Sequence, residues 1–358
     1  MSEMHDIIVS STEKIMRDLS TKELVDLSEK GKFASPLWET LLESGLTKVG
    51  IPESLNGSDG DLHDALEILK LAGKYTLPLP LFETLLVQWL LENEEVGSYD
   101  GPFTFSLNSG LDLKISNNNG ELVIDGELHN VPWARYSTHV LTMEDVGGES
   151  YALLIPMNGA EVVNYSNVAG EPSDRVIFNQ FVVENPIRVK VEKEKFLTQA
   201  KTLGALGKAA MMTGAMEGVM SLTLDYVQER EQFGRPLYRF QAIQQYMATL
   251  AGEVVLTNTL LNQSISKVNQ DSDSSLVSAL KIQANSSVKI VNELAHQIHG
   301  AIGVTHEHKL HQFTRRLWAW REEFGNELEW SKFLANDLLS NSQDLWETIT
   351  ESKVKEFV

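Results

Sequence analysis

The chain has 358 residues, and its 30 Lys and Arg against 50 Asp and Glu give a formal net charge of −20. This acidity argues against nucleic acid and anionic membrane surfaces as partners, because both bind through clustered positive charge. The sequence has no cysteine, which excludes disulfides, thiol nucleophiles and cysteine-ligated metals. It shows neither a signal-peptide pattern nor a stretch of about 18 apolar residues. We therefore expect a cytoplasmic protein without membrane insertion.

The first part of the chain has helical periodicity. Apolar residues recur at three- and four-residue spacing over residues 37–46 and 62–72, and a Gly-rich loop over residues 50–60 separates them. Pro78 and Pro80 end another helix. This pattern predicts an N-terminal α-helical domain over residues 1–98.

The middle of the chain has the periodicity of strands. Between about residues 103 and 191 the apolar period falls to two or to short apolar runs. The predicted strands are 111–115, 122–124, 139–143, 151–155, 176–178, 181–183 and 187–191. Strands at this spacing indicate a β-barrel or sandwich, here a middle β domain over residues 99–200.

Helical periodicity returns at Leu203 and continues to the C-terminus. Apolar stripes along residues 240–265 and 277–298, joined by a short loop, indicate an antiparallel four-helix-type bundle over residues 201–358. The predicted fold class is therefore α+β and multi-domain, in the order helices, strands, bundle.

A cluster of arginines stands out in so acidic a chain. Arg230, Arg235 and Arg239 flank a helix break at Gly234 and Pro236. Arginine binds diphosphates bidentately, and a helix that restarts here offers free N–H groups. The alternative is a solvated loop with surface arginines.

A second candidate is the run His-Gly-Ala-Ile-Gly-Val-Thr over residues 299–305. Gly300 and Gly303 permit a tight turn and a close approach of the backbone to a ligand. A helix C-cap followed by a turn explains the same residues without any ligand.

Together these segments resemble the C-terminal domain of the acyl-CoA dehydrogenase family. The family's motif R-x-x-F-G followed by Gln is matched by Arg230, Phe233, Gly234 and Gln241. Its motif Q-x-x-G-G-x-G followed by Thr or Glu and an Arg is matched by Gln297, Gly300, Gly303, Thr305 and Arg315. Weaker matches at residues 50–57, 126–133 and 169–172 extend the resemblance along the chain.

The resemblance implies FAD bound between subunits. Arg230 and Phe233 would hold the diphosphate and adenine side, and Gln297, Gly300 and Ala301 would contact the adenosine diphosphate half of a cofactor shared with a neighbouring chain. The further cofactor-binding residues that it implies are Gln232, Gly234, Gln241, Gly303, Trp133 and Ser109. The arginines Arg235, Arg239, Arg315 and Arg316 would be directed at the same diphosphate.

The resemblance also implies a catalytic carboxylate, which removes the α-proton of an acyl thioester while the flavin accepts the β-hydride. Most members carry this Glu at one of two positions, which here hold Phe324-Gly325 and Gly204. The candidate replacement is Glu323. Because one residue is about 100° of rotation on a helix, its use needs an altered turn, and an exposed last-turn carboxylate is the alternative.

The missing base suggests a subunit of a heteromer, in which a related chain supplies the carboxylate and both chains frame FAD. The alternative is a self-sufficient acyl-CoA dehydrogenase, a homo-oligomer that uses Glu323. Expected partners are an acyl-CoA or carrier-protein thioester, the homologous subunit and an electron-accepting flavoprotein.

Two readings of other classes stay open. A metal-binding helical bundle is suggested by Glu293-x-x-His296 and the nearby His306, His308 and His311. Di-iron bundles need that motif twice, so we predict no metal site. The second of these alternatives is a purely structural subunit that binds no cofactor.

Overall fold

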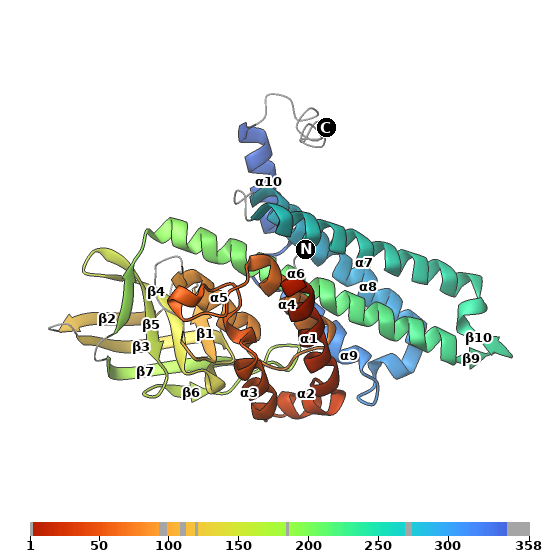
Figure 1. Cartoon of the computed structure of the whole chain (residues 1–358), viewed down its shortest axis with the longest axis horizontal. Helices are drawn as coiled ribbons and strands as arrows, with labels where there is room; N and C mark the ends of the chain where they lie inside the picture. Colours follow the sequence, from red (N-terminus) through yellow and green to blue (C-terminus); the bar gives the residue numbers. More distant parts are fainter. Residues whose placement is uncertain are drawn as a thin grey trace.

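The computed structural model describes residues 3–92, 99–107, 112–118, 121–183, 186–268 and 274–341. Helices come first, then strands, then a helical bundle, and the predicted fold class is confirmed (Figure 1). The N-terminal helices are α1 (Glu3–Leu19), α2 (Lys22–Glu29), α3 (Ser35–Glu43), α4 (Leu62–Lys74) and α5 (Leu81–Glu92). Among the described residues, no helix is long and apolar enough to cross a membrane.

The middle domain is a sandwich of two four-stranded sheets within the described residues. One sheet contains, in spatial order, β1 (Phe103–Ser106), β4 (His139–Val146), β5 (Glu149–Pro156) and β8 (Ile187–Lys190). The other contains β2 (Asp112–Asn118), β3 (Glu121–Pro132), β7 (Ser173–Val183) and β6 (Glu161–Val163). Alternating apolar residues of both sheets, such as Ile124, Val140 and Phe178, form its core.

The strands differ from their prediction in two respects. The apolar runs 176–178 and 181–183 belong to one strand, β7, in which Gln180 has a positive φ of 47° and the pairing with β3 shifts register. This bulge interrupts the alternation and made one strand look like two. The strands β1 and β6 were not predicted, because four and three residues are too few to show a period.

The C-terminal bundle is organised around α6 (Lys193–Glu229), which begins before the predicted domain boundary at residue 201. This helix runs from the β domain to the far tip of the molecule (Figure 1). It is followed by a hairpin of β9 (Glu231–Gln232) and β10 (Arg235–Pro236). The remaining helices are α7 (Gln241–Val268), α8 (Ser274–His299), α9 (Leu310–Glu322) and α10 (Glu327–Asn341).

The helices α4 and α6 cross in direct backbone contact. A Cβ atom on Gly73 would lie 1.9 Å from the carbonyl oxygen of Met211, and one on Gly214 would lie 1.7 Å from that of Lys70. Only glycine fits at either position, so these residues fix the N-terminal helices on the bundle.

One arginine joins all three domains. Arg316 on α9 is 1% exposed; its Nη1 lies 3.0 Å from Glu29 of α2 and its Nε 3.2 Å from Glu171 of the β domain. Arg315 pairs with the same Glu29. The prediction that Arg316 is directed at a diphosphate is therefore wrong, because its charge is neutralised inside the protein, and Arg315 shares that carboxylate.

We predict that Arg316→Met lowers the free energy of unfolding by about 3–5 kcal/mol, because it leaves the buried carboxylate of Glu171 without its cation and removes one of the two arginines that pair with Glu29. Urea denaturation measures the loss. The control is Arg17→Met, whose pair with Asp18 is exposed on both sides and is worth about 0–1 kcal/mol. Equal losses for the two variants would show that the three-domain contact carries no special stability.

Candidate functional site

A cavity of about 1230 Å³ lies between the β domain and the bundle. The β domain contributes the end of β1, the end of β3 and residues of the 165–173 loop. The bundle contributes three residues of α6, the end of α9 and the turn before α10. A cleft of this size between domains is where ligands commonly bind.

The two positions predicted for a catalytic base lie in contact at this cavity. Phe324 lines the cavity, and a Cβ atom added to Gly204 on α6 would lie 2.2 Å from its ring. The rings of Phe82 and Phe105 are centred 5.7 and 5.6 Å from that of Phe324. An aromatic cluster thus fills the space that a carboxylate at either position would need.

Glu323 lies on the wall of the same cavity, directly after the last residue of α9. Its side chain is about one-third exposed, and its Oε2 is 2.9 Å from the ammonium of Lys208. Lys208 is buried on α6 and also lies 3.3 Å from the buried Glu83 of α5. The carboxylate of Glu323 is thus paired with a lysine that is buried inside the protein.

Burial and neighbouring charges shift the pKa values of this cluster. Burial raises the pKa of Glu83 to about 7, with Lys208 opposing and Glu323 reinforcing the shift. Burial disfavours the charged form of Lys208, but Glu323 and Glu83 outweigh it and raise the pKa of this ammonium. A charged Lys208 holds Glu323 toward the core, beside the Phe324 ring.

Ser106 is a cavity residue that sequence reasoning missed. It is the last residue of β1 and only 4% exposed, and its hydroxyl has no hydrogen-bond partner in the described part of the chain. A buried hydroxyl without a partner costs free energy, which indicates a ligand at this wall. The hydroxyl predicted from the sequence, Ser109, lies outside the described residues. No sequence signal indicates Ser106, because a strand of four residues is too short to show a period.

Trp133 lies inside the β domain and not on the cavity wall. It is buried, with a positive φ of 57°, and its ring packs near that of Tyr136. Asn130 and Pro132, just before it at the end of β3, line the cavity instead. His129 of the same strand also lines the cavity, so these three residues of the segment are the ones placed to contact a ligand there.

The first cofactor motif lies at the opposite end of the bundle. Arg230 follows the last residue of α6, and the β9–β10 hairpin presents Phe233 with 91% of its surface exposed. Gly234, with a φ of 77°, has open space where a side chain would be. The guanidinium of Arg235 stacks on the Phe240 ring at 4.1 Å.

The second motif meets the first at this end. The helix α8 ends at His299 and a 3₁₀ turn follows over Gly300–Val304. Tyr226 of α6 stacks on His299 at 4.4 Å and donates a hydrogen bond to its carbonyl oxygen. The structure thus brings the two predicted motifs together. Of their predicted cofactor residues, Gly303 is buried, and the following are exposed: Arg230, Gln232, Phe233, Gly234, Gln241, Gln297, Gly300 and Ala301.

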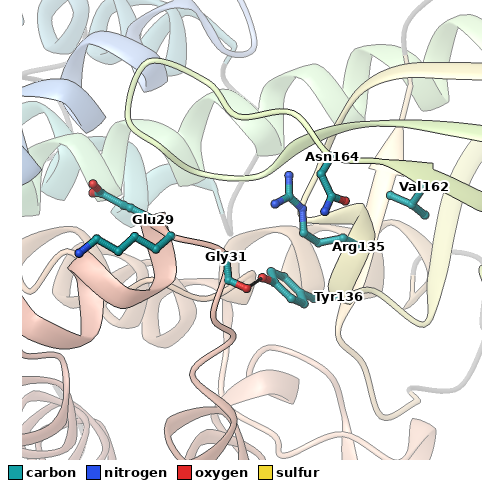
Figure 2. Close-up of a pocket in the computed structure, with 7 residues that line it drawn as sticks. Glu29, Gly31, Arg135, Tyr136, Val162 and Asn164 are labelled. Atoms are coloured by element: carbon teal, nitrogen blue, oxygen red, sulfur yellow. Dashed lines mark hydrogen bonds between the residues drawn. The ribbon is translucent and has the colours of Figure 1, made fainter.

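A smaller cavity of about 720 Å³ separates the end of α2 from the β domain (Figure 2). Tyr136 donates a hydrogen bond across it to the carbonyl oxygen of Gly31 at 2.7 Å. The guanidinium of Arg135 binds Asp174, which is fully buried, and also the backbone of Tyr165. These contacts support the 165–173 loop that forms one wall of the larger cavity.

The histidines near the second motif pair with protein groups. His296 Nε2 lies 3.0 Å from Thr314 Oγ1, and the rings of His299 and His308 are 4.7 Å apart. In the described part of the chain, no three His, Asp or Glu side chains are arranged to hold a metal ion.

The C-terminal half of the chain matches a family model. Residues 197–327 match the model described as Acyl-CoA dehydrogenase, C-terminal domain. Acyl-CoA dehydrogenase IpdE2 of Mycolicibacterium smegmatis is 25% identical over 322 residues, which cover 88% of this chain and 93% of that protein. Residues 197–327 are thus similar to the C-terminal domain of acyl-CoA dehydrogenases, and the similarity to IpdE2 extends over most of the chain.

Solved structures share the fold of this chain. The ChsE4-ChsE5 complex from Mycobacterium tuberculosis matches with a TM-score of 0.85 and 19% identity over 96% of this chain and 99% of the matched chain. A structure of PigA with FAD and proline matches with a TM-score of 0.83 and 14% identity over 96% and 99%.

We predict that protonation of His299 destabilises the protein in acid. Burial lowers the pKa of His299 to about 4 from 6.5. The unfolded chain therefore binds more protons between these values, and stability is lost as the pH falls from about 6.5 towards 4, by up to about 3 kcal/mol. Unfolding free energies of wild type and His299→Gln measure this effect.

The variant should lose less stability than wild type across this range, while His129→Gln, at an exposed position, should follow wild type. Parallel curves for wild type and His299→Gln would contradict the assignment.

Proposed function

We propose that this chain is the subunit without a catalytic base in a paired, acyl-CoA dehydrogenase-like flavoprotein. The pair would carry out α,β-dehydrogenation of an acyl thioester with FAD, and a related chain would supply the glutamate. The observation that carries this proposal is the Phe324 ring over Gly204.

This contact bears on both base positions at once. A glutamate at position 204 would need the volume that the Phe324 ring occupies, and Phe324 replaces the glutamate of the other position. The ring is fixed by Phe82 and Phe105, so restoring a carboxylate here needs more than a rotamer change. This supports a site whose proton acceptor comes from another chain.

The residues present fit a flavin cofactor. Ser106 offers an unpartnered buried hydroxyl at the cavity wall, beside Asn130 and Pro132. At the far end of the bundle, Arg230 and Phe233 are exposed in the arrangement that suits a dinucleotide's diphosphate and adenine. When bound, FAD would supply the hydride acceptor.

The separation of the two regions supports a shared cofactor. Both lie on α6, the cavity at Ala200 and the motif just after Glu229, and a helix rises about 1.5 Å per residue, so they are about 45 Å apart. This is longer than one extended dinucleotide. The cavity and the motifs of this chain would therefore not bind the two ends of one cofactor, and a neighbouring chain would complete the flavin site.

The roles of this chain's residues follow from that arrangement. The ends of β1 and β3 would line the flavin, the 165–173 loop and Trp318 would exclude water, and the aromatic cluster would close the cavity. The ChsE4-ChsE5 complex, of which one chain shares this fold, supports a second chain as partner. An electron-accepting flavoprotein would reoxidise the cofactor.

We predict that co-expression with the related chain yields a yellow complex with one flavin per pair of chains, whereas this chain purified alone holds little FAD. Absorbance in the flavin bands against protein concentration measures the ratio. Phe233→Ser should lower the flavin content of the complex, and Tyr99→Ser, which changes an exposed aromatic elsewhere, should not. A full complement of flavin on this chain purified alone would refute the pairing.

A self-sufficient dehydrogenase that uses Glu323 is the second candidate. It is favoured by the position of Glu323 on the cavity wall with part of its carboxyl exposed. It is disfavoured by the ion pair with Lys208, which holds that carboxylate toward the core.

Glu323→Gln decides between the two candidates. If a related chain supplies the base, we expect the complex to keep turnover within a few-fold of wild type. If Glu323 is the base, turnover falls by about 10²–10⁴-fold while FAD stays bound. Glu322→Gln, a change at the neighbouring exposed carboxylate, is the matched control. Steady-state dehydrogenation with an artificial electron acceptor is the measurement.

A further inference from the structure

Lys281 of α8 is a fully buried lysine that the proposed chemistry does not use. Its side chain is 0% exposed, and its ammonium lies beneath the turn that joins α9 to α10. The ammonium donates to Asn285 Oδ1 at 2.8 Å, to the Trp320 carbonyl oxygen at 3.1 Å and to that of Arg321 at 3.2 Å. All three N–H groups are therefore used by neutral oxygens.

The two carbonyls belong to the last turn of α9, where backbone oxygens lack partners within the helix. A cation at this end also interacts favourably with the helix dipole. Lys281 thus caps a helix other than its own. Asn285, one turn further along α8, extends the support by donating to the Gly325 carbonyl oxygen at 3.3 Å.

The turn held in this way carries the residues that define the cavity. Phe324 has a positive φ of 54°, which is unfavourable for a residue with a bulky side chain, and Gly325 follows with a φ of 100°, which glycine adopts readily. Trp330 of α10 donates to the Phe324 carbonyl oxygen at 2.8 Å from the other side. The backbone contacts from α8 and α10 fix where the Phe324 ring and the Glu323 carboxylate stand.

We propose that Lys281 is a positioning residue, whose ammonium holds the 320–325 turn so that Phe324 covers Gly204 and Glu323 faces the cavity. This positioning role involves only residues of this chain. It applies whether the catalytic base comes from a related chain or from Glu323, so the test of Lys281 is independent of the proposed function.

Charged groups around Lys281 influence its protonation, and therefore the hydrogen bonds that it donates to the turn. Lys208 of α6 repels the ammonium, while Glu322 and Glu323 at the end of α9 and Glu327 of α10 attract it. Burial is the largest cause, and the pKa of Lys281 is lowered to about 7. A neutral amine donates two hydrogen bonds and not three, so one of the three oxygens loses its partner when the proton leaves.

Hydrogen exchange of the full chain, followed by mass spectrometry of peptides, tests the proposal. In Lys281→Met we expect the amides of residues 322–326 to exchange at least tenfold faster than in wild type, with α7 unchanged. Lys289→Met, at an exposed position two turns along the same helix, should leave the turn as in wild type. Wild-type protection of the turn in Lys281→Met would overturn the proposal.

The pH dependence gives a second readout that needs no variant. Burial lowers the folded pKa of Lys281 below the ordinary 10.5, so an opening that exposes this lysine to water takes up a proton, and after correction for intrinsic exchange rates opening of the turn in wild type should become less frequent as the pH rises above about 7. Amides of α7 measured in the same experiment report global unfolding, so a change confined to the turn reports its local opening. A turn whose opening is independent of pH in wild type would refute the role of the ammonium.

Discussion

The cavity exists because a single buried guanidinium holds three domains against one another. Arg316 sits between Glu29 of the N-terminal helices and Glu171 of the β domain, and Trp320 on the same helix donates to Glu171 as well. Such a charge is costly to bury and tolerable only when fully paired, so the three domains are constrained to meet in one arrangement. The walls of the cavity come from the β domain and the bundle, so its shape depends on this contact.

A second buried cluster shapes the floor of the cavity. Lys208 and Lys281 approach the end of α9 from two helices, one through the Glu323 carboxylate and the other through backbone carbonyls. Between them, the turn places an aromatic ring where the family places a carboxylate. Under the proposed function, the chain would keep the architecture of a dehydrogenase subunit, with its motif residues exposed at the far end of the bundle, while the Phe324 ring closes the expected position of the proton acceptor.

The order of domains was predictable because each type of element has its own apolar period, and those periods change where the domains change. Contacts between distant residues were not predictable. Arg316 looked like a phosphate ligand in an acidic chain, but its partner Glu29 lies 287 positions away. The sequence identified Gly204 and Phe324 separately as departures from the family. The packing of the Phe324 ring on Gly204 depends on how α6 and the end of α9 meet. A local sequence pattern contains no information about that contact.

If the proposed function holds, this chain by itself does not remove the α-proton of the substrate. Single-turnover reduction of the flavin by an acyl-CoA, with FAD supplied in excess, tests this directly for this chain alone and for the same chain mixed with its related partner. We expect no bleaching of the flavin for the chain alone and rapid bleaching for the mixture. Bleaching at the same rate by the chain alone would contradict the proposed function.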